Sequence, residues 1–466
     1  MRDEMERKHR LRTAWTSSHA FIPAVLLLLL TACVPQEPEA APTPAAHVFE
    51  NPQAEINTHA ILALLSKDDP THAHWVDYFG GSVDIDGDVL VAGAPEWGRP
   101  SGEGIGAAYV FRRSPDGEWL LEATLTASDR DDGFQYDQHF GEVIAIQDGV
   151  IAVGAPDYDD VQAGDNIGAV YLYEYDDGAW METGKLTSSR KTPGAKMGSG
   201  LAFDGNLIAV SGAPEAGTIS IFQRQAGGWR EQAQVAVPVS PDGEPGYVLL
   251  DLYGDTLAFS TVTMYPLDEN DVASVLRRTG SVILFERTGD EWKQSFQTAP
   301  QEASLYRMYD GPYGIPVALG GEAGRASWLA VGKSGFPESG REQGSVAIFE
   351  RGDRGWELRG ELRLAPGEAV PGALWLSRED PEDPGTTFFG ADVEIEDNRL
   401  AVVSTFANTV YVFERQESGW AYRFRLIPEY HDDFQRRTVA ISGNRLLIGS
   451  PGELGGGSAF VFDLAP

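Results

Sequence analysis

The chain has 466 residues, and its 70 Asp and Glu residues outnumber its 36 Lys and Arg residues, giving a formal net charge of −34 at pH 7. Binding of nucleic acid or of an anionic lipid surface requires basic patches, so this charge excludes nucleic acid as a partner of the folded part. Cys33 is the only cysteine, so no disulfide bond within the chain can stabilise it.

The first 33 residues have the pattern of an export signal. Basic side chains over residues 7–12 precede an apolar run over residues 21–30, which is shorter than the roughly 20 residues needed to span a bilayer. The run ends in LTAC at residues 30–33, which resembles the lipobox of bacterial lipoproteins, where the cysteine becomes the acylated N-terminus. We therefore predict a lipoprotein signal peptide over residues 1–33, with Cys33 as the lipid attachment site. An ordinary secretory signal with a chance cysteine is the alternative.

The segment that follows is rich in Pro and Ala, and reads VPQEPEAAPTPAA over residues 34–46. Such a composition favours an extended chain that buries no core. We assign residues 34–52 to a tether and residues 53–466 to a folded domain. The signal and tether together predict an envelope lipoprotein that faces the periplasm or the exterior and touches the membrane through its N-terminal lipid.

One sequence unit then recurs seven times. The clearest copy reads FGGSVDIDGDVLVAGAP over residues 79–95, followed by GAAYVF over residues 106–111 and a Gly-x-Trp turn. The next copy reads FGEVIAIQDGVIAVGAP over residues 140–156, followed by GAVYLY over residues 168–173. Self-similarity at this period is typical of propeller blades or of solenoid repeats.

Each unit predicts a four-stranded antiparallel blade. In the first unit Val83 and Ile85 alternate with polar residues, which indicates a half-buried strand. Asp86-Gly87 predicts a two-residue hairpin turn, because glycine readily adopts the positive φ that such turns need. The partner strand over residues 89–92 is continuously apolar, so we expect it to be buried on both faces. Two further strands, on either side of the Gly-x-Trp turn, complete the blade.

The unit count predicts an all-β fold, a seven-bladed β-propeller. Six blades is the main rival, because a weak fourth or fifth unit within residues 247–388 could be an insertion. The seventh unit stops after three strands, whereas residues 56–69 resemble the fourth strand of the first unit, residues 120–132. We therefore predict that an N-terminal strand closes the ring, which removes the open sheet edge.

The repeated pattern is similar to the FG-GAP repeat family, known from the integrin α-subunit propeller and from bacterial exported proteins. The resemblance covers residues 56–462, and residues 125–180 are closest to the bacterial lipoprotein branch. The resemblance implies Ca²⁺ sites of the form DxDxDGxxD, which integrin-type repeats often contain. The corresponding segments here are tight turns such as Asp86-Gly87 and Asp148-Gly149, with too few carboxylates, so those sites do not carry over.

Two other loops are acidic enough to consider as metal sites, because Ca²⁺ takes six to eight oxygen ligands. Their carboxylates are Asp129, Asp131, Asp132 and Asp137 in one loop, and Asp157, Asp159, Asp160 and Asp165 in the other. Ca²⁺ is thus the candidate cofactor. A solvated acidic surface is the alternative interpretation.

Two further motifs could suggest ligands. The first is a set of tryptophans that recur at one position of the repeat: Trp119, Trp180, Trp229, Trp292, Trp356 and Trp420. This recurrence favours packing between blades over a carbohydrate-binding set. The second is Arg351-Gly352-Asp353, the tripeptide that integrins bind. The aligned turn at residues 287–290 indicates that a repeat turn spells it by chance.

No HExxH motif, nucleophile elbow or phosphate loop occurs in the sequence. We therefore predict a non-catalytic binding or interaction scaffold, lipid-anchored at the cell envelope, whose ligand is an unknown protein or carbohydrate. The alternative is a propeller hydrolase or lyase with Asp157, Asp160 or His139 at the axial face. Convergence of acidic and histidine side chains would distinguish the two, because propellers host both roles.

Overall fold

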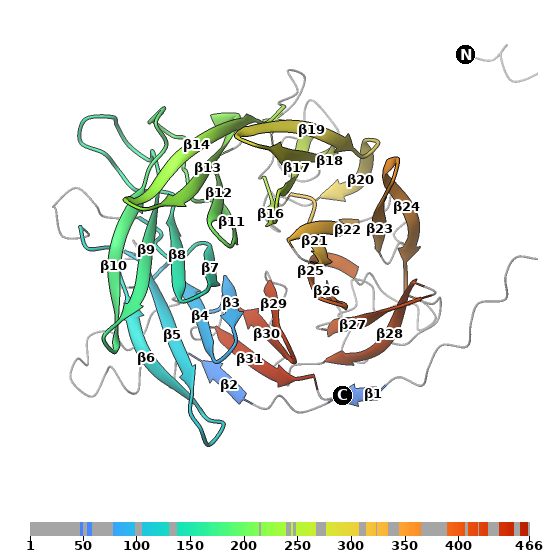
Figure 1. Cartoon of the computed structure of the whole chain (residues 1–466), viewed down its shortest axis with the longest axis horizontal. Helices are drawn as coiled ribbons and strands as arrows, with labels where there is room; N and C mark the ends of the chain where they lie inside the picture. Colours follow the sequence, from blue (N-terminus) through green and yellow to red (C-terminus); the bar gives the residue numbers. More distant parts are fainter. Residues whose placement is uncertain are drawn as a thin grey trace, which may run out of the picture. The chain divides into compact units, whose positions relative to one another are not determined.

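The repeated units fold as seven antiparallel sheets, the blades of a propeller (Figure 1). The computed structural model describes residues 47–49, 54–57, 78–97, 105–129, 138–213, 216–238, 244–245, 248–266, 276–306, 314–322, 324–333, 344–364, 389–405, 409–417, 419–426, 438–451 and 457–464. Residues 44–466 form one compact unit, which contains all seven blades. The predicted signal peptide and Cys33 lie outside the described residues.

The first three blades contain four strands each. Blade 1 consists of β3 (Val83–Asp86), β4 (Val89–Ala94), β5 (Ala107–Arg113) and β6 (Trp119–Leu125). Blade 2 consists of β7 (Ile144–Gln147), β8 (Val150–Ala155), β9 (Ala169–Asp176) and β10 (Ala179–Leu186). Blade 3 consists of β11 (Gly200–Asp204), β12 (Leu207–Ser211), β13 (Thr218–Gln225) and β14 (Gly228–Ala236).

The fourth blade is the largest, and the fifth is regular, so both weak repeat units form blades and the six-blade alternative is wrong. Blade 4 consists of β15 (Glu244–Pro245), β16 (Leu250–Tyr253), β17 (Thr256–Pro266), β18 (Leu276–Thr288), β19 (Glu291–Gln297) and β20 (Gln301–Tyr306). Blade 5 consists of β21 (Val317–Glu322), β22 (Arg325–Lys333), β23 (Ser345–Gly352) and β24 (Gly355–Leu362).

The last two blades each pair with a strand from the N-terminal part of the chain. Blade 6 consists of β25 (Phe389–Glu396), β26 (Arg399–Ser404), β27 (Thr409–Gln416), β28 (Gly419–Leu426) and the parallel strand β1 (His47–Phe49). Blade 7 consists of β29 (Thr438–Ser442), β30 (Arg445–Ser450), β31 (Ser458–Asp463) and the antiparallel strand β2 (Ala54–Asn57). Residues 58–69 lie outside the described residues, so ring closure by an N-terminal strand stays a prediction.

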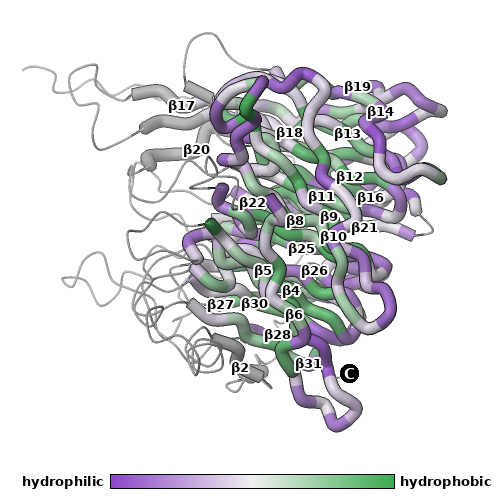
Figure 2. Tube along the Cα trace, turned by 90° about the vertical axis from the view of Figure 1, so that its left-hand side faces the viewer, coloured by the Kyte–Doolittle hydropathy of each residue, from purple (hydrophilic) through white to green (hydrophobic). Residues whose placement is uncertain are grey.

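In the regular blades the strand order follows the chain order, from the axis outward. The first strands, β3, β7, β11, β16, β21, β25 and β29, surround the centre of the ring in Figure 1. We call these the innermost strands. Within the described part, the apolar core divides into seven clusters, each between two adjacent blades. Figure 2 shows apolar residues along the strands and hydrophilic ones at the turns.

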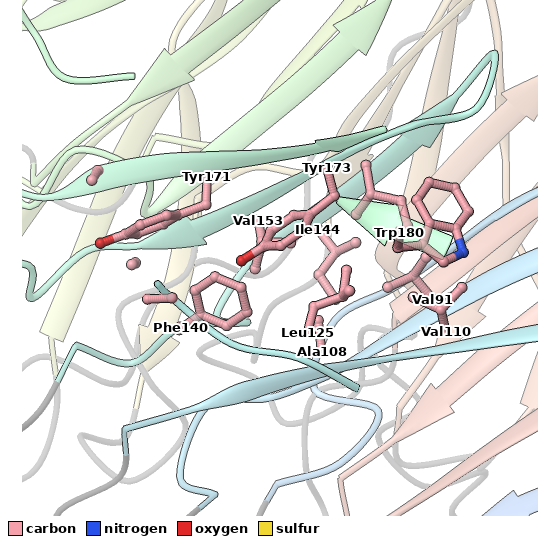
Figure 3. Close-up of a cluster of buried hydrophobic side chains, with 14 of the residues drawn as sticks. Val91, Ala108, Val110, Leu125, Phe140, Ile144, Val153, Tyr171, Tyr173 and Trp180 are labelled. Atoms are coloured by element: carbon pink, nitrogen blue, oxygen red, sulfur yellow. The ribbon is translucent and has the colours of Figure 1, made fainter. Parts of the chain in front are cut away.

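Blades 1 and 2 illustrate one such cluster (Figure 3). Val91 and Val110 of blade 1 pack with Val153 of blade 2, and Trp180 closes the cluster on the outer side. The Trp180 indole Nε1–H also donates to Glu122 of blade 1 at 2.8 Å. Each of the six recurrent tryptophans lies in or against the cluster shared with the preceding blade, as the packing interpretation predicted.

The Phe-Gly and Gly-Ala-Pro motifs meet at the junctions between blades. A Cβ on Gly93, in the Gly-Ala-Pro motif of blade 1, would lie 2.0 Å from the carbonyl oxygen of Gly141, in the Phe-Gly motif of blade 2. Gly449 of blade 7 stands in the same relation to Gly80 of blade 1, at 2.2 Å. Both motifs require glycine because two backbones approach there more closely than any side chain allows.

Candidate functional site

One end of the propeller carries the connections into each first strand and those between each second and third strand. We call this end the loop face. The strands of a blade are antiparallel, so these two kinds of connection lie at the same end. In blades 1 to 3 they include the described residues 126–129, 138–140, 156–168 and 187–197, which contain Asp129, His139 and the four carboxylates of the second acidic loop.

The residue before each Phe-Gly motif, or its Met-Gly equivalent, is held in a left-handed conformation in blades 1, 2 and 3. These residues are Tyr78, His139 and Lys196, with φ values of 53°, 49° and 46°. Non-glycine residues seldom adopt this region. The repeat thus places a side chain of variable chemistry at one defined position of the loop face in each of these blades.

His139 joins two carboxylates from adjacent blades. Its Nδ1 lies 2.7 Å from Oδ2 of Asp157, and its Nε2 lies 3.2 Å from Oε1 of Glu96. Glu96 and Asp157 are equivalent, because each follows the Gly-Ala-Pro motif of its blade. The Lys196 ammonium lies 2.6 Å from the other oxygen of Asp157. Glu96, His139, Asp157 and Lys196 thus form an alternating row across blades 1 to 3, which we call the charge chain.

The charge chain keeps Asp157 ionised. Burial on its own would raise the pKa of Asp157, but the hydrogen bonds from His139 and Lys196 outweigh burial and lower the pKa below its ordinary value. The side chain of Asp157 is only 14% exposed, so these partners act in a weakly solvated place. The charge chain is therefore an ordered set of polar contacts between blades, in which Lys196 and Asp157 form an ion pair.

Other predicted metal ligands are also bound by side chains of the protein. Asp129 accepts a hydrogen bond from the Tyr171 hydroxyl at 2.6 Å, and its second oxygen lies 2.7 Å from the Lys185 ammonium. Asp160 lies 2.7 Å from the Lys191 ammonium, and this bond, with backbone N–H donors, lowers the pKa of Asp160 to about 2.

The remaining predicted ligands do not converge on these groups. Asp159 accepts the backbone N–H of Asn166 at 2.6 Å, and Asp165 uses its backbone carbonyl to accept from Gly194. Asp131, Asp132 and Asp137 lie outside the described residues. Within the described part, no group of three or more His, Cys, Asp or Glu side chains could hold a metal ion. Lysine ammonium groups therefore balance three of the described carboxylates, and Ca²⁺ binding stays a prediction.

A second acidic region lies on the innermost strands and was missed by the sequence reasoning. We call its members the axial carboxylates: Asp84, Asp86, Asp204, Asp251, Glu322, Asp392, Glu394 and Glu396. From the alternation of apolar and polar residues in β3, we expected a strand with one buried face and one face in solvent. In the structure, Val83 and Ile85 pack toward blade 7, whereas Asp84 and Asp86 bond to blade 2.

Axial side chains bind the next blade through backbone N–H groups of its first hairpin. Asp86 accepts from Asp148 at 2.8 Å, and Gln147 accepts from Gly205 at 2.6 Å. The same contact joins the ends of the ring, because Ser442 of blade 7 accepts from Gly87 of blade 1 at 2.9 Å. These bonds tie neighbouring blades together beside the axis.

The integrin-binding tripeptide is engaged within the domain. Arg351 ends in an ion pair with Glu286 of blade 4, and its side chain is 18% exposed. Arg351 and Gly352 are the last residues of β23. An arginine that is partly buried and paired within the domain agrees with the interpretation that this turn spells the tripeptide by chance.

Fold and junctions define the class of protein: a seven-bladed β-propeller whose blades meet through paired Phe-Gly and Gly-Ala-Pro glycines. A family model described as FG-GAP repeat matches residues 73–111 and 119–173. These matches and the seven blades of one design support an FG-GAP β-propeller family for the chain. Its fold suits an interaction scaffold.

Comparison with known proteins adds the following. None of the curated proteins matches the sequence. Similar solved structures include the mitotic checkpoint complex, at 13% identity and a TM-score of 0.49 over 92% of this chain and 100% of that one. The WD40 domain of coronin from Toxoplasma gondii matches at 11% identity and a TM-score of 0.48, over 84% of each chain. The periplasmic gluconolactonase of Pseudomonas aeruginosa matches at 14% identity and a TM-score of 0.40, over 75% and 85%.

The described residues contain no helix of the length and apolar character needed to cross a bilayer.

Proposed function

We propose that the protein is an exported, lipid-anchored propeller that acts as a non-catalytic binding scaffold at the cell envelope, with the loop face of blades 1 to 3 as its binding surface. The observation that carries this proposal is the charge chain. Its polar contacts join loops from three blades in one arrangement, and ordered loops on a rigid scaffold are a common site of recognition.

The state of His139 also supports binding over catalysis. A general base needs a free nitrogen lone pair within reach of a substrate proton. Both ring nitrogens of His139 face carboxylates, and a protonated ring could donate to both of them. The ring is therefore placed to bridge blades, and its nitrogens are already engaged.

The loop face offers a matched pair of variants for testing this proposal. Val161 lies in the 156–168 loop and is 80% exposed, whereas Met181 lies on outer strand β10 and is 55% exposed. Residues 34–466, immobilised and incubated with native envelope extract, should retain a partner that Val161→Asp loses and Met181→Asp keeps. Retention of the partner by both variants, or loss by both, would contradict the loop face as the binding surface.

A hydrolase or lyase is the second candidate, because the structure brings together His139 and Asp157, which the alternative interpretation named. Glycoside, phosphoester and ester substrates should be screened with residues 34–466. Turnover that disappears in both His139→Asn and Asp157→Asn, while the Asp165→Asn control keeps it, would establish this candidate and overturn the scaffold. Absence of turnover on all three classes would leave the scaffold as the better account.

A further inference from the structure

Arg425, on β28 of blade 6, is a buried cation whose donors lack an acceptor. It is 8% exposed, which makes it the most buried Asp, Glu, Lys, Arg or His residue that the structure describes. Its Nε and Nη1 atoms are both buried, and within the described residues neither has a hydrogen-bond partner. A buried charge is costly unless an opposite charge and hydrogen bonds compensate it. Arg425 therefore indicates a position where an anion would fit.

The repeat gives Arg425 an equivalent in blade 2. Arg425 pairs across strands with Tyr411 of β27, as Lys185 of β10 pairs with Tyr171 of β9. The phenylalanine of the Phe-Gly motif packs edge-on against each tyrosine, with ring centroids 5.5 Å apart in blade 2 and 5.4 Å apart in blade 6. The two cations thus lie at one repeat position, beside the same tyrosine.

Blade 2 shows a carboxylate bound at this position. The Lys185 ammonium lies 2.7 Å from one oxygen of Asp129, and the Tyr171 hydroxyl donates to the other oxygen at 2.6 Å. Asp129 belongs to the connection that follows β6 of blade 1. The side chains of Lys185 and Asp129 are 29% and 21% exposed, so the carboxylate position in blade 2 is open to solvent at the loop face.

Other blades also supply a partner at this repeat position, whereas blade 6 does not. Gln234 of blade 3 donates to the Ser188 hydroxyl at 3.2 Å, and Glu361 of blade 5 accepts from the Lys333 ammonium at 2.5 Å. Asp129 lies four residues after the end of β6, and the residue four positions after the end of β24 is a proline, which has no side-chain acceptor. The repeat therefore provides the cation and the tyrosine for blade 6, but not the carboxylate.

We propose that Arg425 and Tyr411 bind the carboxylate group of a ligand at the loop face between blades 5 and 6. The guanidinium presents its N–H donors in a planar fork that matches the two oxygens of a carboxylate. Tyr411, which packs in the cluster shared by blades 5 and 6, supplies a hydroxyl donor as Tyr171 does to Asp129. This site lies outside blades 1 to 3, so it is separate from the binding surface proposed above.

The test compares the melting temperatures of wild type and Arg425→Met in a buffer free of carboxylate and phosphate. Arg425→Met should melt higher there, because it removes an uncompensated buried charge and keeps most of the side-chain volume. Sodium acetate should raise the melting temperature of wild type more than sodium chloride of equal ionic strength does, and Arg425→Met should lose this difference. Arg423→Met should keep it, because Arg423 lies on the same strand, is 45% exposed and pairs with Glu414.

Three results would overturn the proposal. A lower melting temperature of Arg425→Met in the ligand-free buffer would show that a carboxylate of the chain itself already compensates the guanidinium. An acetate response that is absent in wild type, or equal in wild type and Arg425→Met, would exclude a site at Arg425. If Arg425→Met does not fold, Tyr411→Phe removes only the hydroxyl and should raise the acetate concentration needed for half of the shift. An unchanged concentration would then exclude the site.

Two further probes distinguish the sources of the carboxylate. Glucuronate represents an acidic sugar, and N-acetylaspartate amide represents an acidic side chain of a protein partner. Each should give a shift that Arg425→Met abolishes, and the probe with the lower half-saturating concentration identifies the source. Absence of a shift with both probes would count against a ligand site. The Val161→Asp experiment concerns blades 2 and 3, so its outcome is independent of this test.

Discussion

At the scale of single residues, Asp157 shows how one carboxylate serves two blade junctions. It bonds to His139 within blade 2 and to Lys196 of blade 3, and through His139 it reaches Glu96 of blade 1. Removing its charge leaves His139 and the Lys196 ammonium without their common acceptor in a weakly solvated place. Loss of a buried charged partner costs more than the net contribution of an ordinary hydrogen bond.

We predict that Asp157→Asn lowers the free energy of unfolding by about 1–3 kcal/mol at pH 7, measured by urea denaturation. The pKa of Asp157 is depressed in the folded state, so its contribution exists above the ordinary aspartate pKa and disappears as pH falls through the folded value. The two proteins should therefore converge in strongly acidic solution. Asp165→Asn, at an exposed aspartate that bonds through its backbone, should stay within about 0.5 kcal/mol of wild type.

Lys185 determines how the Asp129 loop would respond to Ca²⁺. Its ammonium occupies one oxygen of Asp129 and also bonds to the Tyr158 hydroxyl at 2.8 Å. We expect millimolar Ca²⁺ to raise the melting temperature of Lys185→Gln more than that of wild type, because the competing cation is gone. Ca²⁺ at a hundredfold excess over its Kd would raise the free energy of unfolding by about 2.7 kcal/mol. Lys293→Gln, which removes an exposed lysine paired with Glu291, is the control, and an equal response in both variants would contradict the expectation.

At the scale of elements, the blade junction depends on backbone contact. Gly93 of β4 lies against the carbonyl of Gly141, which opens blade 2, and the same pairing recurs at Gly154 with Gly198 and at Gly332 with Gly390. Neither partner can move alone, because Gly93 is paired within β4 and Gly141 donates its N–H to the carbonyl of Gly154 in its own blade at 2.9 Å. The junction therefore tolerates no added atom.

We predict that Gly93→Ala destabilises the domain by about 1–3 kcal/mol, the usual cost of overpacking, measured by thermal or urea denaturation. Gly360→Ala is the matched control, because Gly360 also lies in a strand, β24, and a Cβ there would meet nothing within 4 Å. A Gly93→Ala protein as stable as Gly360→Ala would show that the blades can shift apart without cost.

The sequence predicted elements better than contacts between them. Hairpins and blades followed from Asp86-Gly87 and similar turns, because alternation and turn chemistry are local. The charge chain did not follow, because its members come from three repeats and meet only when the blades assemble. The repeat positions of these residues could have indicated the charge chain. Its two acids, Glu96 and Asp157, each follow a Gly-Ala-Pro motif, and His139 and Lys196 each precede the glycine motif of the next repeat. Asp84 was misread because alternation cannot distinguish solvent from the next blade.

At the scale of the whole molecule, the predicted closing strand can be tested by truncation. We expect a protein that starts at Asn51 to melt at a higher temperature than one that starts at Thr71, which lacks β2 and residues 58–70. Each large apolar side chain that a closing strand buries would contribute roughly 1.5–3 kcal/mol. Equal melting temperatures would rule out ring closure by this segment.

The predicted membrane attachment depends on one atom, the sulfur of Cys33. Two or more acyl chains give stable anchoring, whereas one chain is marginal. We predict that Cys33→Ser abolishes labelling by radioactive palmitate and moves the protein from the membrane fraction to the soluble fraction. A labelled, membrane-bound Cys33→Ser protein would contradict the lipoprotein assignment, and wild type processed in parallel controls the fractionation.

The hydrogen bond between Ser442 and Gly87 joins residues that lie 355 positions apart in the sequence. Blade 1 therefore completes its packing only when blade 7 has formed. Blade 1 is synthesised early, yet one of its faces stays uncovered until blade 7 has been made. Contacts between distant residues slow folding, and uncovered apolar surface invites aggregation meanwhile. The predicted export signal would mean that the ring forms only after most of the polypeptide has emerged from the membrane.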